Sequence, residues 1–301
     1  MNKKDFNMQC MTPKKGFLGL DPSDAVAYKD AKAVIIPFGL ENSVTYGGGT
    51  AKGPAAIIRA SHEVELFDEQ LWCEPFRQIG IVTLDEPKIE PKILAALQQL
   101  ENIVTRVLKD KKFPLVLGGE HSITIGAIRP FLKQYDDLIL LHFDAHADLR
   151  DGYQGEHYSH ASAIRRCLDA DNLEVVSVGI RNISREEIPF LEKNRDRIHI
   201  YWGKDKKNWD VKKIVSHLKD RPIYLTFDVD GFDSCVMPAT GTPEPGGLFW
   251  EEAIEIITAA SQVGTLVGAD VNELAPVSHL HSCDFLVAKL VYKMLSLFRT
   301  K

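Results

Sequence analysis

The chain alternates apolar runs of strand length with segments of helical spacing. The runs are AVIIPFGL (33–40), FPLVLGG (113–119), LILLHFDAH (138–146), EVVSVGI (174–180), IHIYW (198–202), PIYLTFDVD (222–230) and TLVGADVNEL (265–274). Most are rich in Val, Ile and Leu without polar alternation, which is typical of parallel strands covered on both faces. Segments such as 92–108, 250–260 and 283–298 have apolar residues at helical spacing. Strand and helix in this alternation predict an α/β fold with a mainly parallel sheet.

No linker, repeat or low-complexity stretch divides the 301 residues, so we expect one domain over 1–301, with residues 1–30 as a partly irregular extension. Hydrophobic residues make up 45% and charged residues 26%, an ordinary globular balance. A net charge of -6 argues against a nucleic-acid surface. The N-terminal segment has no apolar core of signal-peptide length, and no later run is long enough to span a membrane. Five scattered cysteines form no C-x-x-C pair. These features favour a cytoplasmic protein without membrane contact.

Metal-binding residue types follow three of the predicted strands. Asp144, His146 and Asp148 alternate after one strand, and Asp228 and Asp230 after another, so the side chains of each set point the same way. His121 follows a third strand through a Gly-Gly turn. Any one of these residues alone is most often a helix cap or a satisfied core residue. All six together would repel strongly at the ends of buried strands unless cations neutralised them.

The ligand types indicate the metal. No cysteine lies in the set, so a thiolate zinc or iron–sulfur site is disfavoured, and carboxylates with some imidazole favour manganese. A pair of such ions lowers the pKa of a shared water and presents hydroxide near neutral pH. The sequence therefore predicts two divalent cations per chain, with Mn²⁺ favoured and iron, cobalt or zinc as possible substitutes, and a demanding hydrolysis.

Three blocks, GGEHSITIGAIRP, LHFDAHADLRD and FDVDGFDSCVMPATGTPEPGGL, resemble the metal signatures of the ureohydrolases, the family of arginase and agmatinase. The resemblance covers nearly the whole chain. It implies the arginase-like fold, a single three-layer α/β/α domain with a sheet of roughly eight strands. It also implies a homo-oligomer, a trimer or hexamer, that splits a guanidino compound into urea and an amine. By the same resemblance Asp144 and Asp228 bridge two manganese ions. His121 and Asp148 complete the shell of one ion, and His146 and Asp230 complete that of the other.

The resemblance further implies Asp230, His160 and Glu273 as catalytic residues. A planar cationic guanidinium needs a carboxylate partner, and Glu273 in GADVNELAP matches the family's guanidinium-binding glutamate. His160 in GEHYSHAS matches its active-site histidine, which would protonate the leaving amine; His157 is a weaker candidate. Glu273 and His160 are thus also predicted to contact the substrate.

The substrate's tail is the open question. Arginases carry an acid where VGIRNISREEI places Ser184, and the DLRDGYQGEHYSHASAIRR loop resembles the agmatinase branch. We therefore expect agmatine to be hydrolysed to putrescine and urea, with Ser184 and Glu156, or Glu186 or Glu187, near the tail. Arg185 would instead suit the carboxylate of 4-guanidinobutyrate. An arginase or guanidinase specificity, a zinc deacetylase-like enzyme and a non-catalytic scaffold are the alternatives, although a single zinc would not need six ligands.

Overall fold

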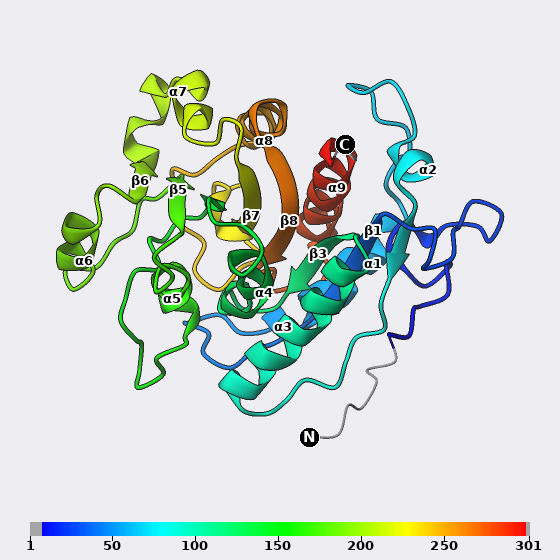
Figure 1. The fold of residues 1–301 in the computed structure, drawn as a ribbon, viewed down its shortest axis with the longest axis horizontal. Helices are drawn as coiled ribbons and strands as arrows, with labels where there is room; N and C mark the ends of the chain where they lie inside the picture. Colours follow the sequence, from blue (N-terminus) through cyan, green and yellow to red (C-terminus); the bar gives the residue numbers. More distant parts are fainter. Residues whose placement is uncertain (1–7, 299–301) are drawn as a thin grey trace.

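The computed structural model describes residues 8–298, and within that range eight parallel strands form one sheet in the order β2-β1-β3-β8-β7-β4-β5-β6 (Figure 1). The strands are β1 Ala33–Phe38, β2 Ile81–Thr83, β3 Phe113–Gly118, β4 Ile139–Phe143, β5 Glu174–Val178, β6 Ile198–Tyr201, β7 Pro222–Asp228 and β8 Thr265–Asn272. Seven of them lie within the predicted apolar runs. The three residues of β2 are too few for a hydrophobic pattern to be recognised. The predicted α/β fold with a parallel sheet of roughly eight strands is confirmed.

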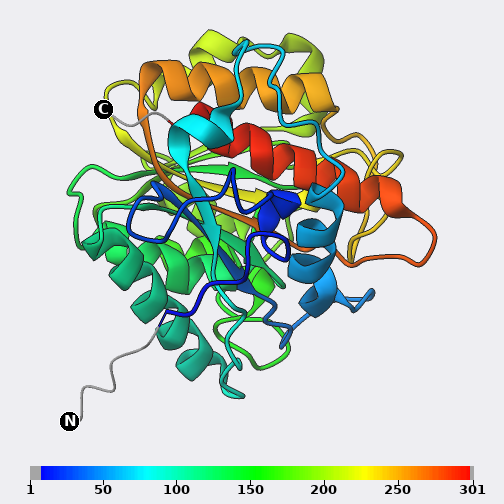
Figure 2. The ribbon, with the colours of Figure 1, turned by 90° about the vertical axis from the view of Figure 1, so that its right-hand side faces the viewer.

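Helices cover both faces of the sheet and give three layers, which Figure 2 shows edge-on. The helices are α1 Gly53–Ser61, α2 Pro75–Ile79, α3 Ile93–Lys109, α4 Ile123–Leu132, α5 Ala163–Cys167, α6 Ile188–Lys193, α7 Val211–Ser216, α8 Trp250–Val263 and α9 His281–Leu297. α3, α4 and α5 pack together on one face, whereas α1, α7, α8 and α9 lie on the other. The long α3 presents Leu97, Leu100 and Val104 to the sheet, as its helical spacing predicts.

The strands are buried on both faces because their side chains alternate between two cores. In β1, Ala33 and Ile35 belong to the core beneath α1 and α9. Val34 and Ile36, between them, belong to the core beneath α3 and α4. This alternation explains why the central strands read as uninterrupted apolar runs.

The predicted N-terminal extension packs against the sheet edge from residue 8 onward; residues 1–7 lie outside the described range. Met11 N donates to Thr83 O, and Phe17 N donates to the Thr83 hydroxyl.

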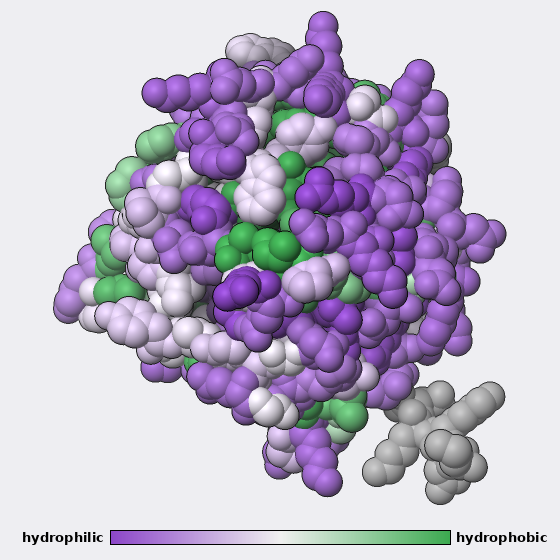
Figure 3. All heavy atoms as spheres, turned by 90° about the vertical axis from the view of Figure 1, so that its left-hand side faces the viewer, coloured by the Kyte–Doolittle hydropathy of each residue, from purple (hydrophilic) through white to green (hydrophobic). Residues whose placement is uncertain are grey.

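The face of the molecule in Figure 3 is largely hydrophilic, with small apolar groups between the polar side chains. Within residues 8–298, no helix combines the length and apolarity needed to cross a membrane.

The order of the strands brings the predicted site residues together. β3, β8, β7 and β4 are consecutive neighbours in the sheet. His121 follows β3, Glu273 follows β8, Asp228 ends β7 and Asp144 follows β4. In open α/β sheets ligands bind beyond the carboxyl ends of the strands, which is the edge where these four side chains lie.

Candidate metal centre and active-site cavity

His121 lies at the centre of one half of a cluster of buried carboxylates. Its Nδ1 is 3.0 Å from Oδ2 of Asp144 and 3.0 Å from Oδ2 of Asp148. Oδ2 of Asp228 is 3.5 Å from the same nitrogen. No hydrogen bond of acceptable geometry satisfies this buried Nδ1. A nitrogen left in this way among three carboxylates fits a metal ligand whose cation would lie between them.

The second half of the cluster is formed by His146 and Asp230. Nδ1 of His146 is 3.0 Å from Oδ2 of Asp230 and 3.6 Å from Oδ1 of Asp144. Asp144 thus reaches His121 with one carboxylate oxygen and His146 with the other. This arrangement suits a carboxylate that bridges two ions. The six predicted ligands all lie around one point, and the donor set fits divalent cations that prefer oxygen with some nitrogen.

Without bound cations, the cluster holds extra protons that offset the repulsion between its carboxylates. Burial raises the pKa of Asp228 well above its usual range, and the charges of Asp230 and Asp144 raise it further. Burial and the neighbouring Asp144 raise the pKa of Asp148 to about 7. Burial lowers the pKa of His146, but Asp230 and Asp144 outweigh it and raise the value to about 12. Bound divalent cations would take the place of the protons that this cluster otherwise attracts.

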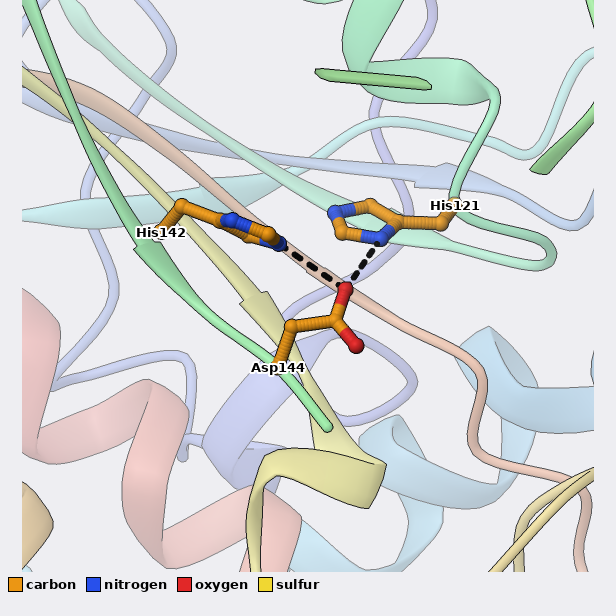
Figure 4. A group of neighbouring side chains, drawn as sticks. All are labelled: His121, His142 and Asp144. Carbon is orange, nitrogen blue, oxygen red and sulfur yellow. Dashed lines mark hydrogen bonds and ion pairs between the residues drawn. The ribbon is translucent and has the colours of Figure 1, made fainter. Parts of the chain in front are cut away.

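Neighbouring polar residues orient the ring of His121 and the carboxylate of Asp144. His121 Nε2 is hydrogen-bonded to the Thr226 hydroxyl at 2.8 Å, and Thr226 in turn donates to the buried Asp270 at 2.6 Å. His142 lies 2.8 Å from Asp144 Oδ2 through Nε2 and 2.9 Å from the Ser177 hydroxyl through Nδ1. Figure 4 shows His142 and His121 meeting the same carboxylate oxygen. Such contacts fix the ring and carboxylate orientations that a metal requires.

His142 and Thr226 were missed by the sequence analysis. Each lies two residues before a predicted ligand, so it points to the same side of its strand as Asp144 or Asp228. A polar residue at that position within an apolar strand is the signal that would have found them.

Glu273 is a buried acid at the end of β8, with φ of 66° in the left-handed region that few side chains adopt. Its Oε1 accepts a hydrogen bond from the backbone N of His121 at 2.6 Å, and its own N donates to Gly119 O. Burial raises the pKa of Glu273 well above its usual range, and nearby Glu120 adds to the effect. An arriving guanidinium would offset that cost. The strained backbone and the buried acid together are typical of a binding site.

His160 begins a short 3-10 turn and lies against the 42–45 loop. The Ser43 hydroxyl is 3.1 Å from Nδ1, and the Thr45 hydroxyl is 2.8 Å from Nε2. The buried Glu120 holds the loop in place by accepting from the Ser43 N and hydroxyl. Burial lowers the pKa of His160 to about 4, and the positive charges of His121 and His146 contribute. The ring is therefore neutral at pH 7 and close to the cluster.

A cavity of about 280 Å³ contains the cluster together with both predicted catalytic side chains. It is lined by Thr45, His121, His146, Ala147, Asp148, Arg150, Tyr153, His160, Ala161, Asn182, Ile183, Ser184, Glu187, Asp228, Asp230, Thr240, Gly241, Thr242, Glu244 and Glu273. Asp144 lies just behind this wall, fully buried. Five of the six predicted metal ligands thus share one space with His160 and Glu273.

The predicted tail residues are only partly in this cavity. Ser184 lines it, but its hydroxyl donates to Glu187, whose other oxygen accepts from Leu149 N. Among the described residues, Glu156, Arg185 and Glu186 are not part of the lining. Oε1 of Glu156 accepts from Tyr158 N.

His157 also lies outside the lining, where it contacts Arg166. Glu244 lines the cavity and was not among the predicted residues. It lies in a loop whose path the local sequence does not reveal.

The chain is similar to known proteins over most of its length. Residues 31–296 match the Arginase family model. The chain is 33% identical to the N(1)-aminopropylagmatine ureohydrolase of Synechocystis sp., covering 92% of each chain. It is 33% identical to the agmatinase of Bacillus cereus, covering 93% of this chain and 95% of the relative. The agmatine ureohydrolase of Thermoplasma volcanium has a similar structure, with a TM-score of 0.82, 29% identity and 94% of each chain covered.

The fold and the cluster define an α/β protein with candidate ligands for a metal centre at the carboxyl edge of its sheet. The chain belongs to the arginase family, and its relatives are ureohydrolases. The resemblance inferred from the three sequence blocks is thereby confirmed.

Proposed function

We propose that the protein is a manganese-dependent ureohydrolase that hydrolyses agmatine to putrescine and urea. The observation that carries the proposal is the shared cavity, in which the metal-ligand cluster, Glu273 and His160 all meet. His121, Asp144, His146, Asp148, Asp228 and Asp230 would hold two ions. When bound, ions of this kind supply Lewis acidity and a water activated near neutral pH.

The protein's own residues supply the rest of the chemistry. The buried carboxylate of Glu273 would bind the planar cationic guanidinium by charge-assisted hydrogen bonds and hold it beside the cluster. His160, between the Ser43 and Thr45 hydroxyls, would pass a proton to the leaving amine. The low pKa of its ring means that it would take up this proton during the reaction rather than hold it beforehand.

The charge of the cavity wall supports a substrate with an amine tail. Among residues 8–298, Arg150 is the only lysine or arginine that lines the cavity. Its guanidinium group already pairs with Glu186. Glu187 and Glu244 also line the cavity. A carboxylate tail, as in arginine or 4-guanidinobutyrate, would face these acids, and like charges in a partly buried site repel. Ser184 offers no charge to the α-ammonium of arginine.

N(1)-aminopropylagmatine is the second candidate substrate. It is favoured by the similarity to the Synechocystis relative. That relative and the agmatinase of Bacillus cereus are each 33% identical in sequence to this chain. Both compounds share the guanidino end and a cationic tail, so the same wall suits both.

Urea release by the manganese-loaded protein tests the proposal. Agmatine, N(1)-aminopropylagmatine, 4-guanidinobutyrate and arginine would be compared by kcat/KM. Agmatine is expected to rank highest, with arginine at least about a hundredfold lower, which corresponds to about 2.7 kcal/mol. A higher value for either carboxylate-bearing compound would overturn the agmatine assignment, and no urea from any of the four would overturn the ureohydrolase proposal.

A further inference from the structure

We propose that Glu244 is the residue that binds the ammonium end of the substrate's tail and selects cationic over anionic tails. The proposal rests on the ureohydrolase function above and adds the residue that determines specificity. It starts from the charged side chains of the cavity wall. Apart from the cluster and Glu273, the charged residues that line the described cavity are Arg150, Glu187 and Glu244.

Two of these three residues are already engaged. Glu187 is buried, and its two carboxylate oxygens accept from the Leu149 N, the Ser184 N and the Ser184 hydroxyl at 2.6 to 2.8 Å. Arg150 pairs with Glu186 and lies beside the ring of Tyr153. A substrate that used either side chain would first have to displace these partners.

Glu244 differs because no hydrogen bond or ion pair within residues 8–298 engages its carboxylate. The side chain is half-buried on the cavity wall. A carboxylate at that place, with the wall's arginine already paired, leaves the cavity with an unbalanced negative charge. An ammonium group is the ligand that this charge attracts.

The backbone around Glu244 is fixed relative to the metal cluster. Arg181 donates from one guanidinium nitrogen to Glu244 O at 2.8 Å and to Asp230 O at 2.7 Å. Its Nε donates to Pro245 O at 3.0 Å. Prolines on both sides of Glu244 restrict the backbone further. Because one arginine joins the Glu244 loop to the metal ligand Asp230, the distance between the two ends of a bound substrate would be set by the protein.

The test compares substrates that differ only at the tail. Wild type and Glu244→Gln would be assayed for urea release with agmatine and with n-butylguanidine, which has the guanidino end but no second charge. We expect kcat/KM for agmatine to fall about tenfold or more in the variant, as for loss of one charged contact. The value for n-butylguanidine is expected to stay within about twofold, which also shows that the variant is folded and metal-loaded.

Glu251→Gln is the matched control because it removes the same charge from an exposed residue of α8 outside the cavity lining. It is expected to leave both values unchanged. In addition, Glu244→Lys should raise the ratio of 4-guanidinobutyrate to agmatine turnover by at least about a hundredfold, because it reverses the charge.

Equal losses for agmatine and n-butylguanidine in Glu244→Gln would overturn the specificity role and indicate a structural one. An unchanged agmatine value, or an equal fall in Glu251→Gln, would overturn it as well. These outcomes leave the ureohydrolase proposal intact because wild type still releases urea. Wild type that releases no urea from either compound would overturn both proposals together.

Discussion

Nε2 of His142 lies 2.8 Å from Oδ2 of Asp144, the same oxygen that Nδ1 of His121 approaches to 3.0 Å. His142 is fully buried and its other nitrogen is bonded to the Ser177 hydroxyl. Burial lowers the pKa of His142, although the hydrogen bond to Asp144 acts against it. A neutral ring bonded at both nitrogens cannot turn easily to become a ligand itself. It therefore orients the Asp144 carboxylate.

This relationship predicts an effect on metal affinity. His142→Ala removes the hydrogen bond to Asp144 and should weaken Mn²⁺ binding by about 10- to 100-fold, the usual scale for such supporting contacts. Competition with a chelator measures the affinity directly. Ser177→Ala, which leaves the contact with Asp144 in place, should have a smaller effect. Unchanged Mn²⁺ affinity in His142→Ala would show that His142 has only a packing role.

The two oxygens of Asp144 predict that its loss affects both ions. Asp144→Asn and Asp228→Asn should each lower the manganese content from about two ions per chain to well below one. Asp148→Asn should spare one ion, because Asp148 contacts only His121 among the histidine ligands. Elemental analysis after gel filtration gives the counts. One tightly bound zinc that none of these changes disturbs would contradict a binuclear manganese centre.

His160 is expected to act in proton transfer rather than in metal binding. His160→Ala should lower kcat for urea release by about 100-fold or more while the manganese content stays the same. His157→Ala is the control because His157 is exposed, contacts Arg166 and is outside the cavity lining. The opposite result, an active His160 variant and an inactive His157 variant, would reassign the proton donor.

Local patterns account for the parts of the site that could be predicted. Asp144, His146 and Asp148 alternate directly after an apolar strand, and this alternation predicts that they lie together. In the structure β4 ends at Phe143 and Asp148 has a φ of 52°, so the path of the chain after the strand also contributes. Glu244 could not be found in this way. Its place on the wall depends on Arg181, which joins segments 63 residues apart in the chain. Such contacts follow from the path of the loops, which periodicity does not determine.

The same limit applies to the tail residues. Glu156 and Glu186 are close in sequence to the predicted site, but neither lines the cavity. Glu156 accepts a hydrogen bond from Tyr158 N, and Glu186 pairs with the cavity residue Arg150. Sequence distance from a motif therefore says little about which side of a loop a charged side chain occupies. The candidate ligands that follow the strands could be predicted because side-chain direction along an extended segment repeats every two residues.

The buried ion pair of Asp68 with Lys293 predicts a pH-dependent contribution to stability. The two side chains are 2.7 Å apart and each is less than 5% exposed. Burial raises the pKa of Asp68, but the hydrogen bonds from Lys293, Leu71 and Gln70 outweigh it, so the folded-state pKa is lowered. The contribution is thus complete above the unfolded-state pKa of about 4 and disappears as the pH falls through the lower folded-state value.

Asp68→Asn should lower the free energy of unfolding by about 3 kcal/mol at pH 7, because it leaves Lys293 buried without a charged partner. The difference from wild type should shrink as the pH is lowered below about 4. Urea denaturation of the metal-free protein at several pH values measures it. Asp21→Asn, in an exposed pair with Lys14, should have little effect. A difference that stayed constant down to pH 3 would contradict the role assigned to the pair.

Glu186 is predicted to affect substrate choice although it lies outside the cavity lining. Its carboxylate pairs with Arg150, which lines the cavity beside Tyr153. Glu186→Gln would leave Arg150 free to bind a tail carboxylate, so the ratio of kcat/KM for 4-guanidinobutyrate to that for agmatine should rise several-fold. The change should be modest because Glu186 is 61% exposed, and exposed ion pairs contribute only about 0–1 kcal/mol. Glu192→Gln is the matched control, because Glu192 lies on α6 and forms an exposed pair with Arg195, and it should leave the ratio unchanged. If both variants raised the ratio equally, the effect would come from the general surface charge, and the pairing of Arg150 with Glu186 would have no part in excluding carboxylate tails.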